Sequence, residues 1–248
     1  MPSVSAVLLP DHLAENELTD RVAIVIDVLR ATTTVTHALD EGAACVIPVA
    51  SVDAARMIAH ERGGSLLCGE RGGIRPDGFH LGNSPAEYRR GVVGGKDLVL
   101  TTTNGTRALG LCERAFSIFV GALTNLEAVV AAVRSTERDV VLVCSGTDGR
   151  VSLEDVICAG LFASRLKPSH DLDDIAMGVM FAGEGAIDRC GGLEGAISSS
   201  FHAGRLVDMG FGADVEYASR LGVSDGVPCF DAVTGEIRPA GQLNRAGG

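Results

Sequence analysis

The sequence is poor in aromatic residues and in lysine, and its charge is strongly one-sided. It contains no tryptophan, two tyrosines and only Lys96 and Lys167 as lysines, and its 21 basic residues stand against 32 acidic residues. With a formal net charge of −11, it lacks the basic, aromatic-rich stripe that is typical of nucleic-acid binding. We therefore expect no nucleic-acid partner, and any anion must be bound chiefly by arginine.

Long apolar runs and paired cysteines are missing as well. No stretch of eighteen apolar residues occurs, and the first nine residues contain neither lysine nor arginine. These features predict no membrane span and no secretory signal, so we expect a cytoplasmic protein. The seven cysteines are odd in number and form no C-x-x-C pair, which argues against a disulfide framework or a zinc finger.

The familiar motifs of phosphate and ester chemistry are absent too. The sequence has no G-x-x-x-x-G-K-[ST] loop, no G-x-G-x-x-G after an early strand and no G-x-S-x-G elbow. The D-x-D signature of haloacid-dehalogenase-like phosphatases would need an acid at position 29, where this chain has Leu29. P-loop, Rossmann and α/β-hydrolase sites are therefore not expected.

Short apolar runs do alternate with helical stretches along the first two thirds of the chain. Their continuous apolar character is typical of strands covered on both faces, and the helical stretches between them are typical of crossovers. We expect an α/β fold in three α/β/α layers, with a mostly parallel or mixed central sheet, formed by one domain over residues 1–248. The expected strands are 22–27, 45–50, 65–68, 97–101, 117–121 and 139–144.

The last third of the chain has a different character. From about residue 172 it is mainly helical. The pattern of residues 227–239, VPCFDAVTGEIRP, then predicts a β-hairpin. The helical part could supply a homodimer interface. Three capping-box patterns predict helix starts: Ser84 with Glu87 in a helix stopped by Gly91, Thr124 with Glu127, and Ser152 with Asp155.

Charged side chains gather just after four of the expected strands. Ligands of open α/β sheets bind outside the carboxyl ends of the strands, so these side chains are expected to share one edge. Arginines there can grip a small anion, and turns such as Asn104–Gly105–Thr106 can offer backbone N–H groups to a phosphate. The charged residues at or after the ends of strands 22–27, 65–68, 97–101 and 139–144 are, in that order, Asp27 and Arg30, Glu70 and Arg71, Arg107, and Asp148 and Arg150.

Acids beside these arginines would repel an anion unless a cation lies between them. Asp27, Glu70, Glu154 and Asp155 are hard oxygen donors suited to Mg²⁺, which takes one or two carboxylates together with waters and substrate oxygens. Each acid can also be a simple helix cap, and a capping box alone accounts for the position of Asp155. No histidine has metal-ligand spacing, and we assign no role to any of them.

One alternative chemistry fits the loop after the strand at 139–144. Cys144 and Arg150 have the C-x5-R spacing of cysteine-dependent phosphatases, in which a thiolate attacks phosphorus and the arginine grips its oxygens. Val143 stands where those enzymes usually have a histidine. A second alternative is an anion-binding protein without catalysis.

Five blocks of the chain together resemble the 2-phosphosulfolactate phosphatase family, in family order and over almost the whole length. The blocks are VIDVLRATTT, GERGG with GFHLGNSPAEY, TTTNGTRAL, CSGTDGRVSLEDVICAG, and SFHAGRLVDMGFGADVEYASRLGVSDGVPCFD. The resemblance implies a Mg²⁺-dependent acid phosphatase that hydrolyses 2-phospho-3-sulfolactate to 3-sulfolactate and phosphate, a step of coenzyme M biosynthesis. Such a small anionic phospho-acid fits the expected cluster of arginines.

The residue roles follow from the same resemblance as hypotheses. Asp27 is either the nucleophile or the group that places an attacking water, and Arg30 acts beside it. Glu70, Glu154 and Asp155 join Asp27 as candidate metal ligands. The candidate substrate-binding residues are Arg71, Asn104, Gly105, Thr106, Arg107, Gly146 and Arg150.

Overall fold

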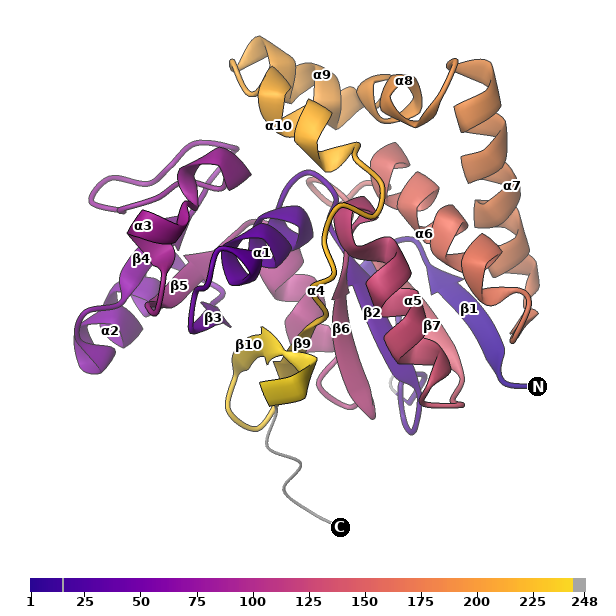
Figure 1. Cartoon of the computed structure of the whole chain (residues 1–248), viewed down its shortest axis with the longest axis horizontal. Coiled ribbons are helices and arrows are strands. Elements are labelled where there is room, and N and C mark those ends of the chain that lie inside the picture. The colour runs from indigo at the N-terminus through magenta and orange to yellow at the C-terminus, as the bar shows by residue number, and fades with distance from the viewer. Residues whose placement is uncertain (15, 243–248) are drawn as a thin grey trace.

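A single mixed sheet of ten strands forms the centre of the molecule (Figure 1). The computed structural model describes residues 1–14 and 16–242. The strand order is β4-β5-β3-β10-β9-β6-β2-β7-β1-β8. The strands are β1 (Ser3–Val7), β2 (Val22–Ile26), β3 (Cys45–Pro48), β4 (Leu66–Gly69), β5 (Asp97–Thr101), β6 (Ser117–Gly121), β7 (Val140–Cys144), β8 (Asp171–Leu172), β9 (Pro228–Asp231) and β10 (Glu236–Pro239).

Helices cover both faces of this sheet, which confirms the expected α/β/α layers. Along β2, Ile24 belongs to the core formed with α5 and α6, whereas its neighbour Val25 belongs to the core formed with α1 and α4. Because successive side chains of a strand point to opposite faces, β2 is buried on both sides. The helices are α1 (Ala31–Asp40), α2 (Val52–Arg62), α3 (Arg90–Val93), α4 (Gly105–Leu111), α5 (Leu126–Arg134), α6 (Leu153–Leu166), α7 (Asp174–Arg189), α8 (Leu193–Ser198), α9 (Phe201–Asp208) and α10 (Gly212–Ala218).

The predicted C-terminal hairpin is present and makes the sheet mixed. It lies between two parallel groups of strands: β10 pairs antiparallel with β3 through Ile237 and Val46, and β9 pairs antiparallel with β6. Residues from the end of the chain therefore join strands that come before residue 122. Strands β1 and β8 are not among the strands expected from the sequence. The serines of β1 interrupt its apolar run, and the strand is held by parallel pairing with β7.

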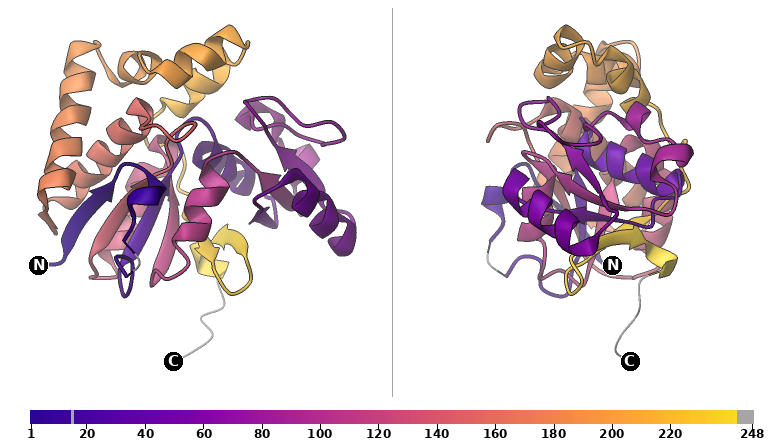
Figure 2. Two further views of the ribbon diagram at one scale, coloured as in Figure 1. Left: turned by 180° about the vertical axis from the view of Figure 1, so that it is seen from behind. Right: turned by 90° about the vertical axis from the view of Figure 1, so that its left-hand side faces the viewer.

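The helix-rich part after residue 172 is confirmed, and it gives the sheet a cover at one end. Helix α7 packs on α6, and α8, α9 and α10 continue across the end of the sheet at which β2 and β7 finish (Figures 1 and 2). This arrangement brings side chains of α9 close to the loops that follow β2 and β7. Within the described residues, no helix combines the length and the apolar character needed to cross a membrane.

Two of the predicted helix starts are wrong: Ser84 bonds to a distant residue, and the buried Thr124 hydroxyl makes no hydrogen bond among the described residues. Only a 3₁₀ turn, Pro85–Glu87, follows Ser84, whose hydroxyl donates to Asp214 at 2.6 Å, and Gly91 lies inside the short α3. Helix α5 begins at Leu126 after a 3₁₀ turn, with the Asn125 carboxamide accepting from the Ala122 N–H at 2.9 Å.

The third capping box predicts the correct start of a helix, but its side chains do not make the expected capping hydrogen bonds. Helix α6 does begin after Ser152, and it is largely buried as its composition suggests. The Ser152 hydroxyl, however, bonds to the Thr147 hydroxyl at 2.7 Å. The Asp155 carboxylate accepts from the N–H groups of Val28 at 2.9 Å and Gly146 at 3.0 Å, so it links two loops instead of capping its own helix.

The tight packing of α6 against α7 yields a stability test. At Gly160 a Cβ would run into the backbone carbonyl oxygen of Val179, whereas at Gly178 on α7 a Cβ would meet no atom within 4 Å. Gly160→Ala should lower the free energy of unfolding by about 1–3 kcal/mol through overpacking. Gly178→Ala, the control, should raise it by about 0.5–1 kcal/mol, because alanine favours the helix. Urea unfolding of both variants measures the difference, and equal midpoints would contradict the close α6–α7 contact.

Candidate active site

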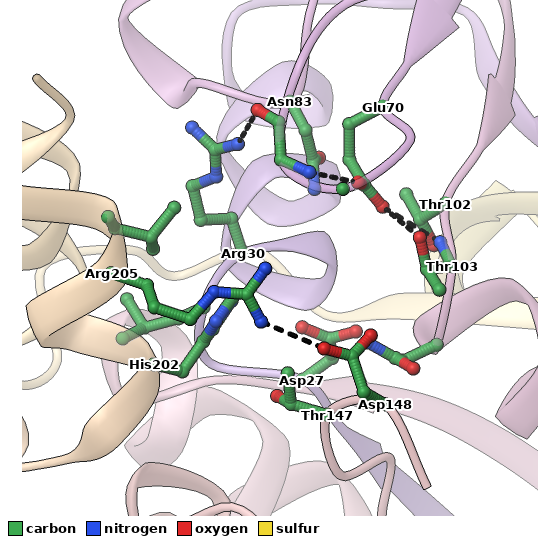
Figure 3. Close-up of a pocket in the computed structure, with 15 residues that line it drawn as sticks. Asp27, Arg30, Glu70, Asn83, Thr102, Thr103, Thr147, Asp148, His202 and Arg205 are labelled. Carbon is green, nitrogen blue, oxygen red and sulfur yellow. Dashed lines mark hydrogen bonds and ion pairs between the residues drawn. The ribbon is translucent and has the colours of Figure 1, made fainter. Parts of the chain in front are cut away.

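A cavity opens at the carboxyl ends of β2, β4, β5 and β7, under helix α9 (Figure 3). We call it the inner cavity. Its wall combines two acidic side chains from strand ends, hydroxyls and amides from the loops, and two basic side chains from α9. The lining residues are Asp27, Leu29, Arg30, Glu70, Gly72, Gly73, Asn83, Thr102, Thr103, Asn104, Thr147, Asp148, His202, Arg205 and Leu206.

Asp27 follows the last residue of β2 and is the most deeply placed acid of the inner cavity, with 6% of its surface exposed. The turn into α1 is fixed by Thr32, whose hydroxyl accepts from the Asp27 N–H at 3.0 Å and donates to the Asp27 carbonyl at 2.8 Å. The Asp27 Oδ1 atom accepts from the Ala31 N–H at 3.1 Å. The threonines after Arg30 therefore shape the turn that presents Asp27.

The surroundings of Asp27 disfavour its ionised form. The pKa of its carboxyl is raised to about 7. Burial is the largest cause, and the nearby charges of Glu70 and Glu154 contribute in the same direction. The N–H groups of Ala31 and Gly105 act in the opposite direction, because they favour the carboxylate. A carboxyl with a pKa near 7 is suited to move a proton at neutral pH.

The predicted phosphate turn lies against Asp27, but its three residues differ in what they do. Asn104 lines the inner cavity. Gly105 begins α4, where a Cβ would lie 2.8 Å from the Asp27 Oδ2 atom, so only glycine allows this approach. Thr106 bonds to Thr102 through both its N–H and its hydroxyl, which secures the first turn of the helix.

Two of the other candidate acids hold loops together. The Glu70 Oε1 atom accepts from the N–H and the hydroxyl of Thr103, at 2.8 and 3.0 Å, and Oε2 accepts from the Gly73 N–H at 2.7 Å (Figure 3). Asp155 bridges Val28 and Gly146 in the same way. Burial raises the pKa of Asp155 well above its usual value, and the charges of Asp27 and Glu154 raise it further.

Glu154 differs from these acids because one of its oxygens has no partner. The residue is 2% exposed, and within the described part of the chain its buried Oε2 atom makes no hydrogen bond. Burial raises the pKa of its carboxyl. Among residues 1–14 and 16–242, no three His, Cys, Asp or Glu side chains come close enough to hold a metal ion by themselves. A cation would take one or two protein carboxylates, and the candidates are Asp27, which lines the inner cavity, and Glu154, which lines a neighbouring one.

The predicted arginines do not converge on one point. Arg30 lines the inner cavity, but its guanidinium is buried and committed: Nη1 donates to Asp214 at 2.7 Å, Nη2 donates to the Gly73 carbonyl at 2.9 Å, and its plane lies over Phe211. It therefore holds the cavity wall.

The remaining predicted binding residues lie outside the inner cavity. Arg71 donates to the carbonyls of Ala50 and Glu70 and to the Thr101 hydroxyl, and Arg107 forms an ion pair with Asp11 at the surface. Gly146 donates its N–H to Asp155, and Arg150 lines a neighbouring cavity. Arg71, Arg107 and Arg150 were expected to share one anion site, but none of them lines the inner cavity.

Two side chains without a predicted role line the inner cavity as well. Helix α9 places His202 and Arg205 over the inner cavity, and the Arg205 Nη1 atom donates to Asp148 at 2.8 Å beside Asp27 (Figure 3). Burial and the charge of Arg205 lower the pKa of His202. Both residues belong to the SFHAGRLVDMG block of the family resemblance, which was the available signal; their spacing alone matches no known motif.

The cysteine alternative finds little support in the surroundings of Cys144. This residue is fully buried at the end of β7 and is not part of the inner cavity lining. Burial raises the pKa of its thiol well above the usual value, and the charge of Asp155 raises it further. A nucleophilic cysteine requires the opposite, a lowered pKa in an electropositive and accessible position.

A family model and several similar proteins point to the same family for this chain. A family model described as 2-phosphosulpholactate phosphatase matches residues 7–232. A probable 2-phosphosulfolactate phosphatase from Thermotoga maritima is 44% identical over 211 residues, which cover 85% of this chain and 89% of that protein. Proteins of the same name from Carboxydothermus hydrogenoformans and Deinococcus radiodurans are each 40% identical, covering 91% and 94% of this chain and 92% and 96% of their own.

The raised pKa of Asp27 predicts how the stability of the metal-free protein depends on pH. Since the folded state keeps a proton on Asp27 up to about pH 7 and the unfolded state loses it near 4, the folded state binds more protons in between. This group therefore makes the free energy of unfolding fall as pH rises from about 4 to 7. In EDTA, the free energy of unfolding, measured with urea at several pH values, should fall less steeply with pH in Asp27→Asn than in the wild type. The difference in slope should be up to about 1.4 kcal/mol per pH unit. Identical slopes would contradict the raised pKa.

Proposed function

Since the chain belongs to the 2-phosphosulfolactate phosphatase family, whose members are phosphoric monoester hydrolases, we propose that it releases phosphate from a small anionic 2-phospho acid with the help of Mg²⁺. The named candidate is 2-phospho-3-sulfolactate, which would give 3-sulfolactate and phosphate. The observation that carries the proposal is Asp27, a buried carboxyl with a pKa near 7 that faces the inner cavity at the end of β2.

In this proposal Asp27 acts on the phosphoryl group directly. Its carboxylate either attacks phosphorus, so that water later releases phosphate from it, or accepts a proton from the water that attacks. In both cases the bond from phosphorus to the ester oxygen breaks, and that oxygen takes up a proton to become the hydroxyl of the leaving acid. Overall, one water supplies this proton and the oxygen that remains on the released phosphate. Asn104 and Thr102 line the same cavity, and the Asn104 amide and the Thr102 hydroxyl can donate hydrogen bonds to phosphoryl oxygens.

The donors for Mg²⁺ in this proposal are chosen by what their oxygens already do. Glu70 and Asp155 accept backbone N–H groups with both oxygens, whereas Glu154 keeps a buried oxygen without a partner among the described residues. Asp27 and Glu154 also lie close enough for their charges to oppose each other. When bound, Mg²⁺ would neutralise charge on the phosphoryl oxygens. Glu70 and Asp155 would then support the loops around it.

Arg205 supplies the anion contact in the proposed site. Its side chain is 38% exposed and its partner Asp148 is 60% exposed, and an ion pair of this exposure contributes only about 0–1 kcal/mol. A substrate oxygen can therefore replace the Asp148 carboxylate at Arg205 at little cost. Arg30, which is fully engaged with Asp214 and Gly73, keeps the wall in place instead.

Phosphate release from a panel of small phospho acids separates the possible chemistries. Wild-type protein should release phosphate from 2-phosphosulfolactate, phospholactate or phosphoglycolate with Mg²⁺ and lose that activity in EDTA. Asp27→Asn should lower kcat at least about a hundredfold, since it removes about 3 kcal/mol of transition-state stabilisation. Cys144→Ser, a buried and nearly isosteric change, should keep kcat within a few-fold.

The opposite pattern would overturn the proposal. Activity that resists EDTA but is lost in Cys144→Ser would favour the thiolate mechanism. Binding of the phospho acids without any phosphate release, measured by calorimetry, would make the protein an anion-binding protein. Circular dichroism of both variants must match the wild type for either conclusion.

A further inference from the structure

A second, larger cavity adjoins the inner cavity, and we call it the outer cavity. It has a volume of about 430 Å³, within the range of about 300–1,000 Å³ that is common for small-molecule sites. Four residues line both cavities: Thr147, Asp148, His202 and Arg205. A molecule bound over Asp27 can therefore extend past these residues into the outer cavity.

The outer cavity has an apolar rim of unusual exposure. Phe201, the first residue of α9, is 81% exposed, and Val151 and Leu153 on the opposite loop and helix start are 48% and 39% exposed. Large apolar side chains gathered at the mouth of a cavity commonly mark a binding surface, because covering them removes apolar area from water. The three side chains line the same cavity as the four residues shared with the inner cavity, so one molecule can contact both groups.

Polar groups of the outer cavity restrict what that molecule carries. Arg150 lies in its lining as an exposed cation, and the Glu154 carboxylate lines it with an oxygen that has no partner in the described residues. One guanidinium suits a single carboxylate, to which it can donate two hydrogen bonds. The apolar part of the wall, formed by Phe201, Val151 and Leu153, suits a hydrocarbon group, while the other lining residues, Ser152 and the four shared with the inner cavity, are polar.

We propose that the outer cavity binds the organic group of the substrate, and that this group is a carboxylic acid with an apolar side chain larger than the sulfomethyl group of sulfolactate. The inference rests on the proposed phosphatase activity, with the phosphoryl group over Asp27. The ester oxygen then lies at the junction, the carboxylate faces Arg150, and the side chain lies against Phe201, Val151 and Leu153. The substrate class is thus a 2-phospho acid with a branched or aromatic side chain, which takes the place of 2-phosphosulfolactate as the best substrate of the proposed phosphatase.

The test compares kcat/KM for phosphate release from three 2-phospho acids that differ only in their side chain. They are phospholactate, with a methyl group, 2-phosphosulfolactate, and 2-phospho-3-phenyllactate. An apolar contact of the size of a methylene is worth up to about a hundredfold in such comparisons. We expect kcat/KM for the phenyl compound to be at least about tenfold higher than kcat/KM for phospholactate and for phosphosulfolactate.

Two exposed phenylalanines provide a matched pair of variants. Phe201→Ala should reduce the ratio of kcat/KM for the phenyl compound over phospholactate at least about fivefold. Phe181→Ala, on α7 outside both cavities and 61% exposed, should leave this ratio within about twofold of the wild type. Because both side chains are exposed, neither truncation should disturb folding, which thermal unfolding checks.

The outcomes separate this inference from the function on which it rests. A phenyl compound no better than phospholactate, or an unchanged ratio in Phe201→Ala, would overturn the inference while the phosphatase activity stood. A clear preference for 2-phosphosulfolactate would do the same and would assign the outer cavity to a second strong anion. If none of the three acids released phosphate, the proposed function and this inference would both be wrong.

Discussion

Buried carboxylates that accept hydrogen bonds from loop backbone hold the site together. Asp155 joins the loop after β2 to the loop after β7 through the N–H groups of Val28 and Gly146, and Glu70 joins Gly73 to Thr103. A hydrogen bond of this kind contributes about 0.5–1.5 kcal/mol when the acceptor is neutral and about 1.5–3 kcal/mol when it is charged. Asp214 extends the same principle, since it binds both Arg30 and Ser84 and so fixes α10 to the cavity wall. The loops need acceptors, and apolar packing cannot provide them.

This way of holding loops has an electrostatic consequence for Asp27. Glu70 and Glu154 place negative charge near a carboxyl that burial has already made hard to ionise, and together they raise its pKa to about 7. A positively charged group close by would reverse the effect, but Arg30 is already paired with Asp214 and Arg205 with Asp148. The site is therefore short of positive charge around Asp27. A divalent cation together with a phosphoryl group would remove this imbalance, which is why the structure is consistent with the proposed metal-assisted phosphatase.

Much of the fold could be predicted from the sequence, because buried strands, crossovers and the final hairpin have local patterns. The position of Asp27 at a strand end and of Asn104 in a loop beside it followed from the rule on strand ends. Most of the failures share a physical cause: a polar side chain near a helix start has other partners within reach besides its own helix. Ser84 and Asp155 bind distant groups, Ser152 binds the Thr147 hydroxyl of the preceding loop, and Arg71 and Arg107 find partners away from the cavity. His202 and Arg205 reach the site only through the packing of α9, which no local pattern encodes.

Phosphoryl chemistry at Asp27 can be tested by a crystal structure of the wild-type protein grown with Mg²⁺ and orthovanadate, which mimics a phosphoryl group in transfer. We expect vanadate in the inner cavity, with its oxygens within reach of the Asp27 carboxyl and close to Asn104. Vanadate bonded to the Cys144 sulfur, or bound at a site away from Asp27, would contradict this expectation.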